Sequence, residues 1–218
     1  MVIAIDGPSG AGKSTAGRIL AKHLGYVFLD TGAMYRALAL MALRRGVPLD
    51  AAEDLAALVR AARIELAPGG EAVSLDGEDV TAAIRSREVS AAASRISVHP
   101  AVRREMVSRQ REMGRKGGVV LDGRDIGTAV FPDADVKFYV DADPAQRARR
   151  RHEELAAAGV SSDLRAIEEE IRQRDQADTT RTDSPLTRAA DAVHVDTTGL
   201  PPDEVVARLM EVVEARRR

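Results

Sequence analysis

Short runs of consecutive apolar residues recur along the chain and predict the strands of one sheet. The five runs are residues 2–5, 27–29, 119–121, 136–140 and 192–195. Their apolar character is continuous rather than alternating, which is typical of parallel strands that helices cover on both faces. After the first run, Ile19, Leu20 and Leu24 have the spacing of a helix face. The pattern therefore predicts an α/β fold with a five-stranded parallel sheet flanked by helices.

A different pattern, between the second and third runs, indicates antiparallel strands. Apolar and polar residues alternate at residues 64–66 and 73–75, and the segment 68–70, Pro-Gly-Gly, separates them. The surrounding stretch, residues 32–116, is otherwise helical in pattern and too long for a simple crossover. We therefore expect a second lobe that carries a small antiparallel β insertion at about residues 63–80.

Three further helices are predicted in the last third of the chain. Residues 144–158 and 163 to about 174 are charged helical segments on either side of a break, and residues 201–216 form the final helix. Pro144 stands where proline is favoured, near the first helical position.

The composition is that of a globular protein and argues against several functions. Hydrophobic residues make up 44% of the 218 residues and charged residues 30%, which provides for a buried core. A net charge of −2 and an aromatic content of 3% argue against nucleic-acid binding. No apolar run approaches the roughly 18 residues of a membrane span. The chain has no cysteine and enters its first strand directly, so we expect no disulfide, no signal peptide and a cytoplasmic location.

The loop after the first predicted strand matches the phosphate-binding (Walker A) pattern G-x-x-x-x-G-K-[ST]. Its residues are Gly7, Pro8, Ser9, Gly10, Ala11, Gly12, Lys13 and Ser14, and Thr15 follows them. The glycines let backbone N–H groups point at phosphate oxygens, and the helix start adds a positive dipole end. In this motif Lys13 reaches the β- and γ-phosphates and the Ser14 hydroxyl contacts Mg²⁺. With a strand before it and a helix after it, the motif predicts a P-loop NTPase fold rather than a glycine turn with a chance lysine.

Aspartates stand at or just after the ends of the five predicted strands. They are Asp6, Asp30, Asp122, Asp141 and Asp196. Ligands of open α/β sheets gather at the carboxyl ends of the strands, so each aspartate is either a site candidate or a loop or cap residue. We expect the cap role for Asp141, which leads into the helix start at Pro144.

Arginines follow the same strand ends and recur at helical spacing. They are Arg36, Arg124, the group Arg147, Arg150 and Arg151, and the pair Arg174 and Arg181, with Asp178 between this pair. One such cluster is usually a solvated, ion-paired helix face. Several clusters at near-neutral net charge favour phosphoryl transfer between two phosphate compounds, in which cations neutralise the transferred group. The N-K-x-D segment of guanine-specific switch proteins is absent, which argues against a GTPase.

Four motifs together resemble the bacterial cytidylate kinase family of P-loop nucleoside monophosphate kinases. They are residues 7–14, 29–36 (LDTGAMYR), 122–128 (DGRDIGT) and 174–178 (RDQAD), and the resemblance runs essentially end to end. It implies a transferase of pyrimidine metabolism that phosphorylates CMP and dCMP with ATP and Mg²⁺ by direct in-line transfer. It also implies a CORE (residues 1–30, 106–146 and 166–218), an NMP-binding lobe (31–105) and a helical LID (147–165).

The resemblance also implies the CMP-binding residues. They are Thr31, Tyr35, Arg36, Ser94, Arg103, Arg124, Asp125, Arg174, Asp178 and Arg181. Cytosine offers an N4 amino donor and the acceptors O2 and N3, so Asp125 and Arg103 suit its edges, with Thr31 nearby. Uracil carries a carbonyl in place of the amino group, which Asp125 would repel. Without the resemblance, Arg103 would be a solvated partner of a glutamate and Ser94 a plain helix serine.

The remaining members of this set suit the phosphate and the sugar of CMP. By resemblance, Arg36, Arg124 and Arg181 hold the acceptor phosphate, because guanidinium groups bind phosphate bidentately. The sugar side matches Tyr35, Ser94, Arg174 and Asp178. Thr31 departs from the family, which often has serine there; the hydroxyl is kept, and we expect retained cytidine preference with altered affinity.

The catalytic residues implied by the resemblance are all cations. They are Lys13, Arg36, Arg124, Arg147, Arg150, Arg151 and Arg181. The CMP phosphate, with a second pKa of about 6, is mostly dianionic at neutral pH and needs no general base. We expect the LID arginines to close over the γ-phosphoryl and exclude water, and the adenine to rest against residues 149–151 and 196–198. Asp122 either orients Mg²⁺ through a water molecule or caps a turn.

Two rival functions stay open on the sequence. One is a kinase for UMP, AMP or a non-nucleotide acceptor, and the other is a regulatory module that binds ATP without turnover. The density of arginines opposite the phosphate loop argues against a pure binder. The four histidines lack the spacing of metal ligands, so we expect no zinc site, and we expect a monomer.

Overall fold

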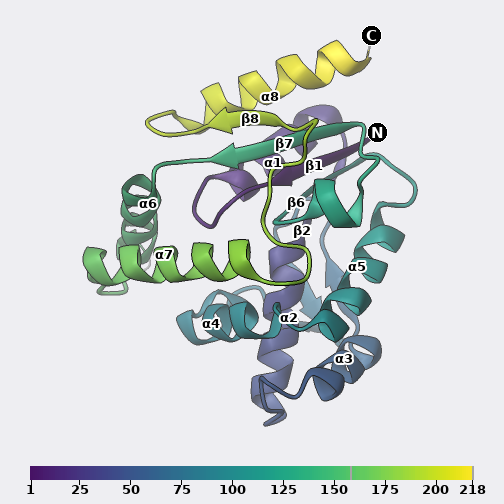
Figure 1. Cartoon of the computed structure of the whole chain (residues 1–218), viewed down its shortest axis with the longest axis vertical. Helices are drawn as coiled ribbons and strands as arrows, with labels where there is room; N and C mark the ends of the chain where they lie inside the picture. Colours follow the sequence, from purple (N-terminus) through teal and green to yellow (C-terminus); the bar gives the residue numbers. More distant parts are fainter. Residues whose placement is uncertain (158, 218) are drawn as a thin grey trace.

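The computed structural model describes residues 1–157 and 159–217, which form two sheets surrounded by helices (Figure 1). The strands are β1 (Val2–Asp6), β2 (Val27–Asp30), β3 (Ile64–Leu66), β4 (Val73–Leu75), β5 (Glu78–Asp79), β6 (Val119–Gly123), β7 (Val136–Asp141) and β8 (Val193–Asp196). The α-helices are α1 (Lys13–Leu24), α2 (Thr31–Arg44), α3 (Ala52–Ala61), α4 (Arg87–Ile96), α5 (Pro100–Gly114), α6 (Pro144–Ala157), α7 (Leu164–Thr180) and α8 (Pro202–Arg217). Two short helices complete the set, the 3-10 helix η1 (Ala83–Arg85) and the π-helix η2 (Ile126–Val130).

The larger sheet has the parallel architecture that the apolar runs predict. Its strand order is β2-β6-β1-β7-β8, and every neighbouring pair is parallel. Each strand begins within one residue of its predicted start. The order places β1 in the centre, so the loop that leaves its carboxyl end lies between the ends of β6 and β7. The prediction of five parallel strands flanked by helices is confirmed.

Helices cover both faces of this sheet. On one face, Leu20 of α1 and Leu209 of α8 share a buried cluster with Ile3, Ile5 and strands β6 and β7. On the other face, Ile126 and Val130 of η2 share a cluster with Leu121 of β6, and side chains of α5 pack against its margin. These layers hold β1 rigidly and leave its carboxyl end free for a site.

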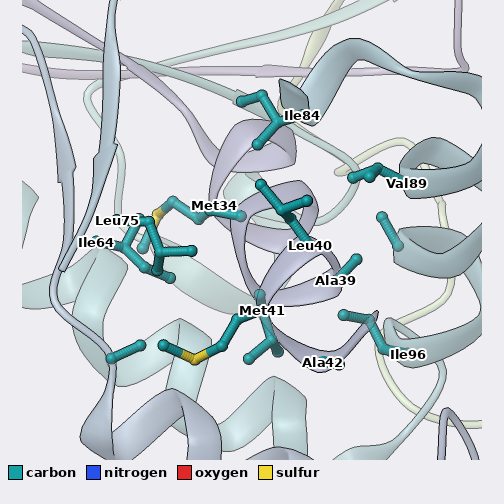
Figure 2. Close-up of a cluster of buried hydrophobic side chains, with 14 of the residues drawn as sticks. Met34, Ala39, Leu40, Met41, Ala42, Ile64, Leu75, Ile84, Val89 and Ile96 are labelled. Carbon is teal, nitrogen blue, oxygen red and sulfur yellow. The ribbon is translucent and has the colours of Figure 1, made fainter. Parts of the chain in front are cut away.

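A second buried cluster lies below the sheet and is built around α2 (Figures 1 and 2). The α2 residues 37–42 are all buried, so this helix is apolar on nearly every side, as expected for a helix surrounded by others. Figure 2 shows Met34 and Met41 of α2 near Ile64 and Leu75 of the small sheet, with Ile96 of α4 on another side. The buried residues of this core are separate from those of the two clusters that pack against the larger sheet.

The predicted β insertion is present, and its tip returns to the larger sheet. Strands β3, β4 and β5 form an antiparallel sheet; the third, two-residue strand was not predicted. The backbone N–H of Phe28, on the edge strand β2, donates to Pro68 O at 2.7 Å. A Cβ on Gly70 would lie 2.4 Å from the Phe28 ring, and the Arg18 guanidinium stacks 5.7 Å from the centre of that ring. The insertion is therefore fastened to the core at its far end.

The helices after β7 differ from the prediction in one respect. The prediction that the helix beginning near residue 163 ends at about residue 174 is wrong, because α7 continues to Thr180. Asp175, Asp178 and the threonines 179–180 are weak helix formers, but Asp178 is held by Arg124 from the β6 loop, which favours continuation of the helix. The predicted end of the preceding helix, residue 158, lies outside the described residues. The division into CORE, NMP-binding lobe and LID stays a prediction.

The described helices include none that is both long and apolar enough to cross a membrane.

Candidate active site

A cleft opens at the carboxyl ends of β1, β2 and β6. Its lining comes from the β1–α1 loop, the β2–α2 junction, α4, α5, the residues after β6, and α7. The lining residues are Ser9, Gly10, Lys13, Ser14, Asp30, Thr31, Gly32, Tyr35, Arg36, Ala93, Ser94, Ser97, Arg103, Asp122, Gly123, Arg124, Asp125, Arg174, Asp178 and Arg181. All ten residues of the predicted CMP set are among them. The fold thus brings together side chains that lie up to 150 positions apart (Arg181 and Thr31).

The β1–α1 loop has a backbone that only glycine allows at its first position. Gly7 has φ +145°, and a Cβ there would lie 1.9 Å from the backbone oxygen of Val140. Gly12, in the left-handed region, caps α1, and Lys13 is the first residue of that helix. The Lys13 side chain is 5% exposed, and its Nζ donates to Pro8 O at 2.6 Å. Burial and the nearby Arg124 guanidinium lower the pKa of Lys13. The loop therefore holds a cation beside its own backbone amides.

Ser14 and Asp122 meet at the base of the cleft. The Ser14 hydroxyl donates to Asp122 Oδ2 at 2.5 Å, while Oδ1 of this buried carboxylate has no hydrogen-bond partner among the described residues. Burial and the neighbouring Asp30 raise the pKa of Asp122. A cation bound here would give Asp122 Oδ1 a partner and would lower the raised pKa of this carboxyl group. Hydroxyl and carboxylate oxygens are ligands that suit Mg²⁺. Within residues 1–157 and 159–217, no group of three or more His, Asp or Glu side chains could hold a metal ion without further ligands.

The far end of the cleft contains a buried pair of opposite charges. Arg103 of α5, 2% exposed, donates through Nη2 to Asp125 Oδ2. Arg181 Nη2 lies 3.8 Å from the other carboxylate oxygen of Asp125. Burial nevertheless raises the pKa of Asp125 above its ordinary value. A carboxylate and a guanidinium are thus fixed side by side, ready for a ligand edge that carries both a donor and acceptors.

Several arginines that line the cleft have some nitrogens paired with carboxylates and others without a hydrogen-bond partner. Arg36 Nη2 donates to Asp30 Oδ2 at 2.9 Å, and Arg124 Nε donates to Asp178 Oδ2 at 2.8 Å. In the part of the chain that the structure describes, buried guanidinium nitrogens without a hydrogen-bond partner occur on Arg18, outside the cleft, and on four cleft arginines, Arg36, Arg103, Arg174 and Arg181. Buried unpaired donors are rare, and several in one cleft indicate an anionic ligand.

Thr31, predicted beside the base, and the predicted sugar-side residues all line the cleft. The Thr31 hydroxyl donates to Asp122 O at 2.7 Å, so it also ties the β2–α2 junction to β6. Burial raises the pKa of Tyr35 to about 12, which keeps it a neutral donor. Burial and Arg124 lower the pKa of Arg174 to about 10, still well above neutrality. Ser94 lines the cleft from α4.

The three arginines of the predicted LID lie outside the cleft lining. Arg147, 3% exposed, donates to Ser9 O at 3.1 Å and to Asp175 Oδ2 at 2.6 Å, so it braces the phosphate loop. Arg150 donates to Thr197 O at 2.7 Å, next to the β8–α8 loop. Arg151 pairs only with Glu154 among the described residues, through an exposed contact of 3.2 Å. Their action on the γ-phosphoryl stays a prediction.

The strand-end aspartates divide into site residues and structural ones. Asp122 lies in the cleft, and so does Asp30, which also caps α2 by accepting from Ala33 N at 2.8 Å. Asp141 and Asp196 accept from the nearby N–H groups of Ala142 and Thr198 and lie outside the cleft lining.

Two functional contacts were missed at the level of sequence. Asp30 holds Arg36, and Asp175 holds Arg147. The signal for Asp30 was its place beside the arginine motif 29–36. Nothing in the sequence pairs Asp175 with a residue on another helix.

Comparison with known proteins agrees with this geometry. A protein-family model described as cytidylate kinase matches residues 3–215. The chain is 51% identical over 216 residues to the cytidylate kinase of Geobacillus sp. (strain WCH70), covering 98% of this chain and 96% of that protein. It is 53% identical over 213 residues to the cytidylate kinase of Symbiobacterium thermophilum, covering 96% and 94%. Among solved structures, an uncharacterized protein from Eubacterium ventriosum aligns over 98% of each chain at 10% identity with a TM-score of 0.56, a likeness of fold alone.

Proposed function

This chain belongs to the cytidylate kinase family. We propose how its cleft carries out the phosphoryl transfer that is described next. The protein transfers the γ-phosphoryl group of ATP to CMP or dCMP and forms CDP or dCDP. The observation that supports the assignment of residues is the single cleft, with the phosphate loop at one end and the Asp125–Arg103 pair at the other. Between them lie Arg36, Arg174 and Arg181, each with a buried guanidinium nitrogen that has no hydrogen-bond partner among the described residues.

The donor half of the site is the loop of residues 7–15. Its backbone amides and Lys13 bind the phosphates of ATP, because the loop curls around the start of α1 and Lys13 is held at its centre. Ser14 and Asp122 would hold Mg²⁺, the hydroxyl as a ligand and the carboxylate by orienting it, since Ser14 donates to Asp122 Oδ2 and Oδ1 has no hydrogen-bond partner among the described residues. When bound, Mg²⁺ neutralises charge on the β- and γ-phosphates.

The acceptor half binds CMP. Asp125 accepts from the cytosine N4 amino group, and Arg103 donates to the edge of cytosine that carries the acceptors O2 and N3. Thr31 lies near the cytosine ring. Arg36, Arg124 and Arg181 bind the CMP phosphate, and Tyr35, Ser94, Arg174 and Asp178 face the sugar. The Arg36–Asp30 and Arg124–Asp178 pairs aim these guanidinium groups before the ligand arrives.

The reaction needs positioning and cations, and the cleft supplies both. The attacking oxygen belongs to the CMP phosphate, which is already deprotonated at neutral pH because its second pKa is about 6. Lys13, Arg36, Arg124 and Arg181 surround the path between the two phosphates and stabilise charge on the transferred group. No side chain has to remove a proton.

The three arginines of the predicted LID have two different roles: two of them stabilise the donor site, and the third moves to contact the substrate. Arg147 and Arg150 brace the donor site, because their present contacts are with the phosphate loop, α7 and Thr197. Arg151 is the one that reaches the γ-phosphoryl, because its exposed pair with Glu154 is cheap to break. Arg151→Ala should therefore lower kcat while leaving the KM for CMP within about twofold; a change in KM alone would contradict this division.

The function is tested by ADP release from ATP and Mg²⁺ with a panel of acceptors. We expect the highest kcat/KM with CMP and dCMP, and no activity in EDTA. Highest activity on UMP or AMP would contradict the cytidine assignment. ATP binding without acceptor-dependent ADP release would instead indicate a regulatory module. Because both halves of the site come from one chain, the protein works as a monomer, and size-exclusion chromatography tests this. A cytoplasmic location stays a prediction.

A further inference from the structure

Asp6 is a buried carboxylate that the reaction described above does not use. It ends β1, is 4% exposed, and immediately precedes Gly7 of the phosphate loop. Its two oxygens accept hydrogen bonds from two successive backbone amides, Ile126 N to Oδ1 and Gly127 N to Oδ2, each at 2.7 Å. One carboxylate therefore satisfies the first two N–H groups of η2, a helix that begins 120 residues further along the chain.

These two amides belong to the residues that follow Asp125. The backbone carbonyl of Asp125 accepts from Ala129 and Val130 and so forms the first turn of the π-helix. The two oxygens of Asp6 accept from the backbone N–H groups at the amino end of this turn. Asp125 is the residue that directly precedes η2, so its backbone leads straight into this turn. The direction of its side chain toward Arg103 thus depends on a turn that is anchored from β1.

We propose that Asp6 is a positioning residue that couples the donor loop to the base-reading carboxylate, setting the orientation of Asp125 through the backbone of η2. This inference rests on the proposed role of Asp125 in reading cytosine. Since Asp6 and Gly7 are consecutive, a shift of the phosphate loop moves the anchor of the base-reading turn, and the reverse also holds. The Asp6 carboxylate thereby sets the position of bound ATP relative to bound CMP.

A carboxylate is needed because both of its oxygens accept. An asparagine has one acceptor oxygen and one NH₂ donor, so it would satisfy one amide and face the other with a donor. The site leaves little room for adjustment, since a Cβ on Gly127 would already lie 3.4 Å from Asp6 Oδ2 and 3.1 Å from Lys137 Cδ. The turn would therefore move rather than the side chain.

The test compares Asp6→Asn with a matched control, Asp135→Asn. Asp135 Oδ2 accepts one hydrogen bond, from Val2 N at 2.6 Å, so the control makes the same carboxylate-to-amide change at the opposite end of β1, where one acceptor oxygen is enough. Steady-state kinetics with CMP and with UMP, and calorimetric titration with CMP alone and ATP alone, are measured for each variant. Buried donors that lose an acceptor typically cost about tenfold in binding. We expect Asp6→Asn to lower CMP affinity and the CMP-to-UMP ratio of kcat/KM by about that factor, with ATP affinity within about twofold.

Three outcomes decide the matter. Equal losses of CMP and ATP affinity, or a lower unfolding temperature with an unchanged CMP-to-UMP ratio, would overturn the proposal, because a merely structural carboxylate predicts either. If Asp6→Asn does not fold, Gly127→Ala presses the amino end of η2 against Lys137, whose Cδ would lie 3.1 Å from the new Cβ, and should lower the CMP-to-UMP ratio; an unchanged ratio counts against the coupling. Asp125→Asn is measured in parallel. A changed ratio there but not in Asp6→Asn refutes this inference alone, whereas no change in Asp125→Asn refutes the base-reading role itself.

Discussion

Replacement of Asp125 by asparagine changes the charge at the base-reading position while keeping its shape. The wild-type side chain is 10% exposed and pairs with Arg103, and Arg181 Nη2 lies 3.8 Å away. Asparagine removes the negative charge and turns one acceptor oxygen into an NH₂ donor. Its remaining oxygen is the natural partner of Arg103, so the NH₂ group faces the nucleotide base.

Asp125→Asn should lower the free energy of unfolding by less than the attraction between the charges alone would imply. Two unit charges 3.8 Å apart attract by about 4 kcal/mol at an effective dielectric constant of 20. Burial opposes this attraction, and its effect prevails, because the pKa of Asp125 is raised despite the two arginines. Asparagine still accepts from Arg103, so this guanidinium keeps one hydrogen bond. We therefore expect a loss of about 1–3 kcal/mol in the free energy of unfolding, measured by urea denaturation.

The effect on specificity should be larger in kinetic terms. An NH₂ group at this position faces the N4 amino group of cytosine unfavourably and donates to the O4 carbonyl of uracil. We expect the ratio of kcat/KM for CMP over UMP to fall about 10- to 100-fold in an ADP-release assay. Asp183→Asn serves as the control, because Asp183 Oδ2 also lies 3.8 Å from Arg103 and is 37% exposed. A CMP-to-UMP ratio that stays at the wild-type value in Asp125→Asn would refute the base-reading role.

Three further outcomes are expected. Lys13→Met should lower kcat at least about a hundredfold without lowering the unfolding temperature, because it removes a buried cation that burial disfavours; near-normal turnover would show that the phosphate loop is misassigned. Gly7→Ala should lower the free energy of unfolding by about 3 kcal/mol, since its Cβ would meet the backbone oxygen of Val140 at 1.9 Å, and a wild-type urea curve would contradict this. Burial, together with the charge of Asp125, raises the pKa of Asp6 to about 6. The hydrogen bonds from its two backbone amides and the charge of Lys13 oppose this increase. The protonated group therefore stabilises the fold below pH 4, and this contribution, about 3 kcal/mol, is lost as the pH rises through 6. Urea curves between pH 4 and 7 should show a larger loss in the wild type than in Asp6→Asn, in which the raised pKa of Asp122 still contributes, and equal losses in the two would count against it.

The parallel sheet could be predicted because its signal is local. Each strand is a short apolar run that needs both faces covered, and β2 and β6 begin at the residues where their runs begin. The phosphate loop is equally local, since the residues of the motif are consecutive. The two-residue strand β5, Glu78–Asp79, carries no such signal because both of its residues are exposed and charged.

The acceptor site could not be derived from the residues alone. Arg103 occupies a helix rich in arginine, and only its burial against Asp125, 22 positions away, distinguishes it from its solvated neighbours. The same limitation applies to Arg147, whose burial depends on Asp175 of another helix. Family resemblance supplied Arg103 and Ser94, and the structure then brought both to the cleft.

The return of the β insertion to Phe28 has a consequence for solubility. β2 is one of the two edge strands of the parallel sheet, and an uncovered edge strand offers unpaired backbone amides to other chains. By accepting from Phe28 N–H, the loop at Pro68 closes part of that edge within the molecule. A chain shortened by excision of residues 63–80 would therefore lose more than a peripheral hairpin. It would expose a strand-pairing surface, and self-association in solution would be the first sign.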